Sequence, residues 1–146
     1  MLRHKLSVSE ISAMFADGLS CSQVVLGQWA DELGYDQEEA HRMASAFGGG
    51  MFRGDTCGAV TGALVAIGLK YGYSDDSPEK KDILMNKVAQ FQKEFIEKMG
   101  STVCRELVGY DFAQDGGLAR AAASGRLMTF CPMAVATALE LLDELM

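Results

Sequence analysis

The 146-residue sequence has only two prolines, Pro78 and Pro132, and it lacks an alternating apolar–polar run long enough for a β-strand. Half-buried strands depend on that alternation, whereas amphipathic helices show a period near 3.6 residues. The sequence therefore predicts an all-α fold. We expect one compact domain over residues 1–146, a bundle of six or seven helices, long enough to bury a sizeable core.

An excess of positive charge is also missing, because 13 Lys and Arg residues stand against 20 Asp and Glu residues, a net charge of -7. A nucleic-acid-binding surface would be basic, so we expect no nucleic-acid partner. The longest apolar run lies within residues 57–69, and crossing a bilayer takes roughly 20 residues. No apolar segment follows the basic residues near the N-terminus. We expect no membrane span and a cytoplasmic location.

The cysteines lack a local C-x-x-C pair, and no C-x-x-C-H signature for attached haem occurs. In a reducing cytosol, four cysteines are more typical of a metal site or of catalysis than of a permanent disulfide framework. Zinc sites usually include two ligands only two to four residues apart, so the spacing disfavours zinc. The four residues are Cys21, Cys57, Cys104 and Cys131.

Helix start and stop signals divide the chain, with Ser7 or Ser9 capping the first helix and Ser77-Pro78 opening the longest one. Asp55 and Thr56 are cap-type residues and place a helix start near Cys57. The expected helices cover about 9–17, 21–33, 36–47, 57–71, 78–99, 103–109 and 131–145, with a short helix at 117–124 inside a longer connection.

By these boundaries, every cysteine lies at a helix N-terminus or in its first turn. Such a position has unpaired amide donors and a partial positive charge, which favour the thiolate over the thiol. The pattern predicts that the four cysteines converge at one end of the bundle. Their thiolates could hold a [2Fe–2S] or [4Fe–4S] cluster, hold a tetrahedral zinc, or work as two thiol–disulfide pairs.

A glycine-rich segment leads into the central helix. Gly58 and Gly62 are four residues apart and predict a strip of small side chains that another helix approaches closely. Each interior glycine, Gly68 included, costs roughly 1 kcal/mol of helix propensity, which indicates close packing or space for something bound.

Three residues near the cysteines are candidate cofactor contacts: Gly58, Arg53 and Arg105. The loop 48–54 could bind an anion, but it matches neither phosphate-loop pattern, so we favour a mobile loop that shapes the cysteine site. Arg105 could stabilise a thiolate or pair with an acid such as Glu106, and both readings stay open.

The two histidines, His4 and His41, disfavour a Cys–His nucleophilic enzyme. We expect His4 on a frayed terminus and His41 at the surface, and such an enzyme would need one of them beside a cysteine.

The chain resembles the redox-active protein family C_GCAxxG_C_C, which is defined by four cysteines and a C-G-A-x-x-G motif. Here the motif is Cys57-Gly58-Ala59-Val60-Thr61-Gly62. The resemblance extends to segments 20–23, 48–51, 67–72, 104–107 and 131–132, and so spans nearly the whole chain. It implies redox activity. A similar domain accompanies haem in split-Soret-type cytochromes together with an iron–sulfur centre, which implies such a cluster at the four cysteines.

We therefore expect electron transfer or redox sensing through the four-cysteine site, with a bound iron–sulfur cluster and a separate electron donor or acceptor protein. One alternative is a metal-free thiol–disulfide protein. The other is a structural zinc or interaction module without a redox role. The sequence leaves enzymatic turnover and homo-oligomer formation open.

Overall fold

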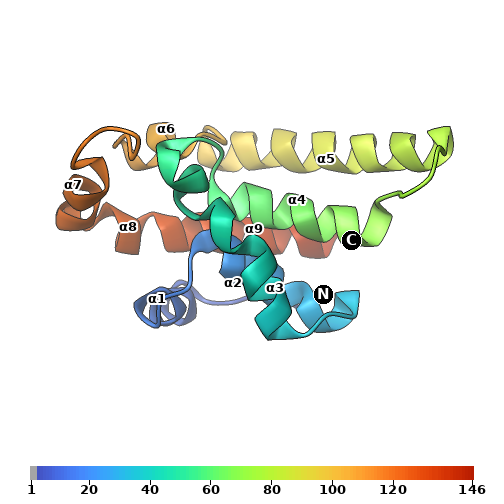
Figure 1. The fold of residues 1–146 in the computed structure, drawn as a ribbon, viewed down its shortest axis with the longest axis horizontal. Coiled ribbons are helices and arrows are strands. Elements are labelled where there is room, and N and C mark those ends of the chain that lie inside the picture. The colour runs from blue at the N-terminus through green and yellow to red at the C-terminus, as the bar shows by residue number, and fades with distance from the viewer. Residues whose placement is uncertain (1–2) are drawn as a thin grey trace.

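The computed structural model describes residues 3–146, and within that range the regular secondary structure is helical (Figure 1). Seven helices in this range are eight residues or longer, so the expected all-α bundle is confirmed. The α-helices are α1 (Val8–Ala16), α2 (Cys21–Leu33), α3 (Gln37–Ala44), α4 (Gly58–Tyr71), α5 (Pro78–Met99), α6 (Cys104–Val108), α7 (Gly117–Ser124), α8 (Arg126–Thr129) and α9 (Cys131–Leu145). Two short helical turns, η1 (Ser45–Phe47) and η2 (Gly50–Gly54), link α3 to α4.

Local capping signals explain why several helix boundaries agree with those predicted from the sequence. The Ser7 hydroxyl accepts a hydrogen bond from the Glu10 amide, and the Glu10 carboxylate accepts one from the Ser7 amide, which completes a capping box on α1. The Ser77 hydroxyl accepts a hydrogen bond from the Lys80 amide and so caps α5, and Pro78 follows at the first position of the helix. Gly34 and Gly100 end α2 and α5 in left-handed conformations.

The structure differs from the expected boundaries at three places. The third helix ends at Ala44 and continues as the tighter turn η1. Helix α8 was not expected. The N-cap of α4 is Cys57 itself, because the preceding Asp55 and Thr56 are drawn into backbone pairing with the segment before α6.

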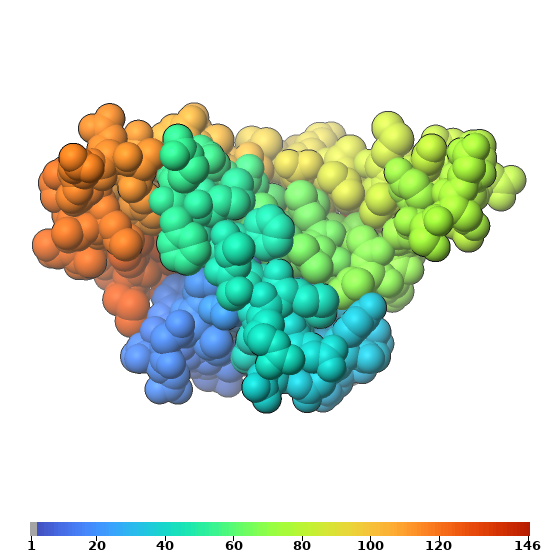
Figure 2. Space-filling view, viewed as in Figure 1, coloured from blue at the N-terminus to red at the C-terminus, as the bar shows by residue number. Residues whose placement is uncertain are grey.

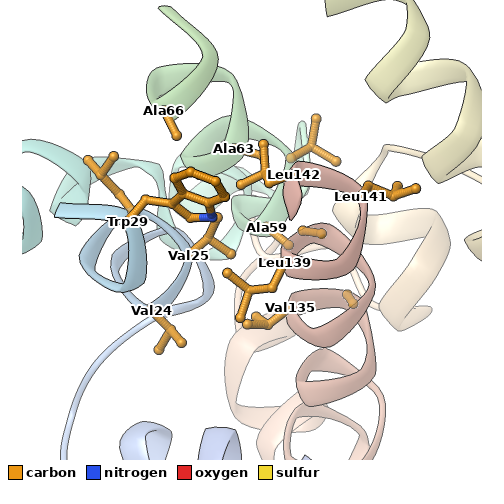
Figure 3. Packing of buried hydrophobic residues seen from close by; sticks show 14 of the residues in the cluster. Val24, Val25, Trp29, Ala59, Ala63, Ala66, Val135, Leu139, Leu141 and Leu142 are labelled. Carbon is orange, nitrogen blue, oxygen red and sulfur yellow. The ribbon is translucent and has the colours of Figure 1, made fainter. Parts of the chain in front are cut away.

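Helices α2, α4 and α9 form the centre of the core, with Trp29 fully buried among them (Figure 3). Val25 of α2, Ala63 of α4 and Leu139 and Leu142 of α9 surround the indole region. Helix α5 packs on α4 and α9 through Phe91 and Phe95, and α3 packs on α2 (Figure 1). These contacts leave the starts of α2, α4, α6 and α9 free to meet at one end of the bundle.

The predicted close approach of another helix to the small-residue strip of α4 is confirmed for two of its glycines. A methyl group on Gly62 would lie 2.7 Å from the Ser22 carbonyl oxygen, and one on Gly58 would lie 3.1 Å from the Ser22 amide nitrogen. Gly68 takes no part, since no heavy atom lies within 4 Å of its Cβ position. The glycines thus let α2 and α4 touch at their N-terminal ends, where Cys21 and Cys57 are.

The expectation of a frayed terminus at His4 is wrong. Its ring is buried and stacks on Trp29 with 3.7 Å between ring centroids. His4 Nδ1 lies 2.6 Å from Asp143 Oδ1, and the His4 amide donates a hydrogen bond to Oδ2 of the same carboxylate. The apolar face of the imidazole and a carboxylate 139 residues away therefore hold this segment in place.

The other histidine is half-buried rather than on the open surface. His41 of α3 lies over Gly27 of α2, where any side chain would collide with the imidazole. It fills a helix–helix contact and is not among the residues that surround the cysteines.

No single helix within residues 3–146 is both long and apolar enough to span a bilayer. Only the pair Gly117–Ser124 and Arg126–Leu145, bent by 59°, reaches that length and composition when taken together.

Candidate functional site: a cavity lined by four cysteines

All four cysteines line one cavity of about 320 Å3 at one end of the bundle. Cys21, Cys104 and Cys131 are the first residues of α2, α6 and α9, so the predicted position at helix starts is confirmed for these three, and Cys57 precedes α4 as its N-cap. All four are free thiols. In Figure 2 the segments of η2 and of α7 and α8 lie at this same end of the molecule.

A short backbone clamp joins Cys57 to Cys104. Thr56 and Val103 form an isolated antiparallel bridge. The Cys57 amide donates to the Thr102 carbonyl at 2.7 Å, and the Cys104 amide donates to the Asp55 carbonyl at 2.5 Å. Two cysteines that are 47 residues apart in sequence are therefore fixed side by side by main-chain hydrogen bonds.

The glycine at position 58 brings Cys21 to the same site. Its Cβ position lies 3.2 Å from the Cys21 Cβ, so any larger residue would push the start of α2 away from α4. Gly58 also lines the cavity, as expected for a residue at the site. Its role in the structure is to allow the close approach of two cysteine-bearing helices.

Cys131 is the one cysteine with a lowered pKa. A hydrogen bond from the Cys21 thiol is the main cause, and the positive charge of Arg126 adds to it. Arg126 is held by a hydrogen bond to the Leu107 carbonyl at 3.0 Å and lies 4.4 Å from the centroid of the Phe130 ring. Arg126 was not predicted from the sequence, where its only signal is a basic residue five positions before a cysteine.

The other three thiols have raised pKa values. Burial raises the pKa of Cys57 to about 11 and that of Cys104 to about 12. The hydrogen bond that Cys21 donates to Cys131, followed by burial, raises the pKa of Cys21. The expectation that a helix start favours every thiolate is therefore wrong for these three. The Ala59 and Val60 amides do lower the pKa of Cys57, but the loss of water around its sulfur outweighs them.

The two arginines named from the sequence flank the cavity and are not among its lining residues. Arg105 Nη1 lies 3.0 Å from Asp55 Oδ1 and also donates to the Gly54 carbonyl. Arg53 is exposed, with Nε 3.9 Å from Asp55 Oδ2. Of the two readings for Arg105, pairing with an acid describes the structure, and that acid is Asp55 rather than Glu106.

The glycine-rich loop forms a left-handed turn beside the cavity. Gly49, Gly50, Met51 and Phe52 all have φ between 58° and 62°. Gly50 is required there, since a side chain would collide with the backbone of Asp55. Met51 and Phe52 adopt a conformation that costs an ordinary residue roughly 1–2 kcal/mol. This strain places Phe52 at the cavity, and such strain is characteristic of functional segments.

Four sulfur atoms at one cavity resemble a metal-binding donor set, but their spacing does not suit one ion. Within residues 3–146, no three His, Cys, Asp or Glu side chains are grouped tightly enough to hold a single metal ion. A tetrahedral zinc would need sulfurs about 2.3 Å from one point.

The chain was compared with known proteins. No curated protein and no solved structure matched it. A family model matched residues 19–145, a span that includes the C-G-A-x-x-G motif and all four cysteines. The chain therefore belongs to the family described as "Putative redox-active protein (C_GCAxxG_C_C)".

Proposed function

We propose that this protein transfers electrons or senses redox state through its four cysteines, acting as one site. The observation that carries the proposal is that all four cysteines line one cavity. The negative charge of one thiolate there raises the pKa of neighbouring thiols, so ionisation of one cysteine affects the others. The description of the family supports a redox role.

An iron–sulfur cluster fits this donor set. Cys21, Cys57, Cys104 and Cys131 would hold it through four thiolates, the ligands that such clusters use. When bound, it would supply one-electron transfer. The apolar walls would keep water from the sulfurs, and the clamp between Cys57 and Cys104 would fix two ligands before binding.

A thiol–disulfide function is the second candidate, and the opposite pKa shifts that the Cys21 and Cys131 thiols impose on each other favour it. The Cys131 thiolate would attack a partner's disulfide, form a mixed disulfide and release one partner thiolate. Cys21 would then lose its proton, attack the Cys131 sulfur and release the second partner thiolate. The partner gains two electrons, and the protein ends with a Cys21–Cys131 disulfide.

The test is an absorption spectrum with iron, sulfide and zinc analysis on protein purified without oxygen. We expect iron and sulfide in near-stoichiometric amounts and a visible band that bleaches with dithionite. A colourless, metal-free protein whose free-thiol count changes by two between oxidised and reduced forms would select the second candidate. Bound zinc together with a constant thiol count would overturn both and leave a structural module.

A matched set of Cys→Ser variants tests whether the four residues act together. Each single variant should lose cofactor retention or redox response to a similar extent if a cluster is bound. If only Cys21→Ser and Cys131→Ser lose the response, the thiol pair is the site. Wild-type behaviour of all four variants would contradict a redox role for the cysteines.

A further inference from the structure

The walls of the cysteine cavity are apolar and aromatic. Phe112 and Phe130 lie in the wall together with Leu107, Leu127 and several smaller apolar residues, while Ser20 supplies the polar side chain besides the cysteines. Among the described lining residues, none is charged. A phosphate or carboxylate group would lose its hydration against uncharged walls, because Arg126 lies outside the lining and donates to the Leu107 carbonyl, so nucleotides and organic acids fit poorly.

The rim of the cavity exposes large apolar side chains. Phe52, Leu118 and Met128 line the cavity and remain 63%, 51% and 46% exposed. They come from η2, α7 and α8, which lie at the same end of the molecule (Figure 1). Apolar side chains gathered at a cavity mouth indicate a binding site, and Phe52 is held there on a strained backbone.

We propose that this cavity binds a small, uncharged, ring-shaped electron acceptor of the quinone class beside the four cysteines. Its volume of about 320 Å3 is at the lower end of the range for small-molecule sites, roughly 300–1,000 Å3. Aromatic walls favour a flat ring. In a redox reaction the reduced thiols on the wall are the electron donors, so a ligand that reacts with them in this way is an electron acceptor. Binding of the ring compound does not depend on the proposed function. Only its reduction by the cysteines rests on that function.

In the thiol form of the site, the reaction balances without another reactant. Cys21 and Cys131 lose their two S–H bonds and form one S–S bond. The two electrons and two protons pass to the quinone, whose two carbonyl oxygens become hydroxyl groups. The protein is oxidised to the disulfide, and the quinone is reduced to the hydroquinone.

Binding is tested separately from reaction by using the reduced form of the ligand. Tetramethylhydroquinone has no free ring position for thiol addition and cannot oxidise a thiol. We would titrate it without oxygen into reduced, metal-free full-length protein and measure binding by calorimetry. We expect one saturable site. Met128→Lys should weaken binding about tenfold or more, because it places a charge beside the apolar ligand.

Met133→Lys is the matched control. Met133 is 45% exposed, almost the same as Met128, but it does not line the cavity. It should leave binding unchanged. Leu118→Lys is the second variant if Met128→Lys fails to fold by circular dichroism. Absence of saturable binding, or equal weakening by the cavity and control variants, would overturn the inference.

The corresponding quinone then distinguishes this inference from the proposed function. The reduced, metal-free protein should reduce tetramethylbenzoquinone, and its free-thiol count should fall by two. If the hydroquinone binds but the site never responds to the quinone, the binding inference holds and the redox function fails. If the cysteines respond to dithionite or thiol reagents but no ring compound binds, the redox function stands and the inference is overturned.

Discussion

Individual cysteines in the site have the same helical position but different chemistry. Cys57 and Cys104 are buried, and burial is the main cause of the raised pKa of both. Cys131 is only half-buried, accepts a hydrogen bond from Cys21 and has Arg126 nearby, so its pKa is lowered. The site is therefore asymmetric, with one sulfur prepared to ionise and three that hold their protons.

Cys131 should react first with iodoacetamide in the reduced, metal-free protein at neutral pH, because only the thiolate is alkylated. Removing the positive charge with Arg126→Gln should raise the Cys131 pKa and slow its alkylation several-fold, moving the pH–rate profile upward. Peptide mass spectrometry over a pH series measures this. Arg105→Gln is the control, since Arg105 pairs with Asp55 outside the cavity. First labelling at Cys57 or Cys104 would contradict the asymmetry.

Alkaline conditions should destabilise the metal-free protein through Cys57. Its pKa is about 11 in the folded chain against an ordinary value of 9.0. Between these pH values the folded chain keeps a proton that the unfolded chain has lost, so the free energy of unfolding falls as pH rises. The stabilisation is complete below pH 9, and its loss reaches at most about 1.4 kcal/mol per pH unit.

Urea unfolding at pH 8 and pH 10 measures this loss. Cys57→Ser should show a smaller decrease than the wild type, and comparison of the two removes the effects of the lysines and tyrosines that both contain. An equal decrease in the two proteins would show that Cys57 does not retain its proton in the fold.

Among the elements, the contact between α2 and α4 sets the geometry of the site. Gly62 has the Ser22 backbone directly over its Cβ position, whereas the Cβ position of Gly68 on the same helix is open. The same substitution should therefore have opposite effects at two positions that are less than two turns apart.

Gly62→Ala should destabilise the protein and separate the starts of α2 and α4, because the Ser22 carbonyl and Cα cannot move independently of the helix. Gly68→Ala should raise the free energy of unfolding by up to about 1 kcal/mol through helix propensity. Thermal or urea unfolding of both variants measures this, and thiol labelling of Cys21 follows the geometry of the site. A stabilising Gly62→Ala would show that α2 and α4 do not touch there.

The sequence predicted the helix boundaries better than any other feature of the structure. Residue types that act within one turn of the chain, such as Ser7, Ser77-Pro78 and Gly100, predicted helix boundaries correctly. The same local reasoning placed the four cysteines at helix starts. It missed α8 and the cap of α4, because the pairing of residues 55–57 with 102–104 depends on partners that are distant in sequence.

Across the whole molecule, the contact of His4 with Asp143 joins the N-terminal segment to α9. The Asp143 side chain is almost fully buried and has its carboxylate on the His4 ring and amide. No pattern within either segment could predict this pair, since it exists only after α2 and α9 have packed around Trp29. The same holds for the cysteine cavity. The cysteines were predicted from the sequence, but Arg126 was not, and neither were the apolar walls, which come from segments distant in sequence.

His4→Ala should lower the free energy of unfolding by about 3 kcal/mol, because the buried Asp143 carboxylate keeps only the His4 backbone amide as a partner and Trp29 loses the ring stacked on it. Arg3→Ala is the control. Arg3 pairs with Glu32 at the surface, and its loss should cost no more than about 1 kcal/mol. Urea unfolding at pH 7 measures both. If both variants lowered the free energy of unfolding by the same small amount, the His4 contact would contribute little to stability.

The direction of helix α9 determines how the protein can be attached to a sensor chip for binding experiments. It begins at Cys131 in the cavity and ends at Leu145 on the opposite side of the bundle (Figure 1). Its 15 residues span about 22 Å. A protein immobilised on a sensor chip through the end of α9 would therefore present the cavity mouth to the flowing solution. Small ligands and protein partners could then be compared on the same chip, in the same orientation.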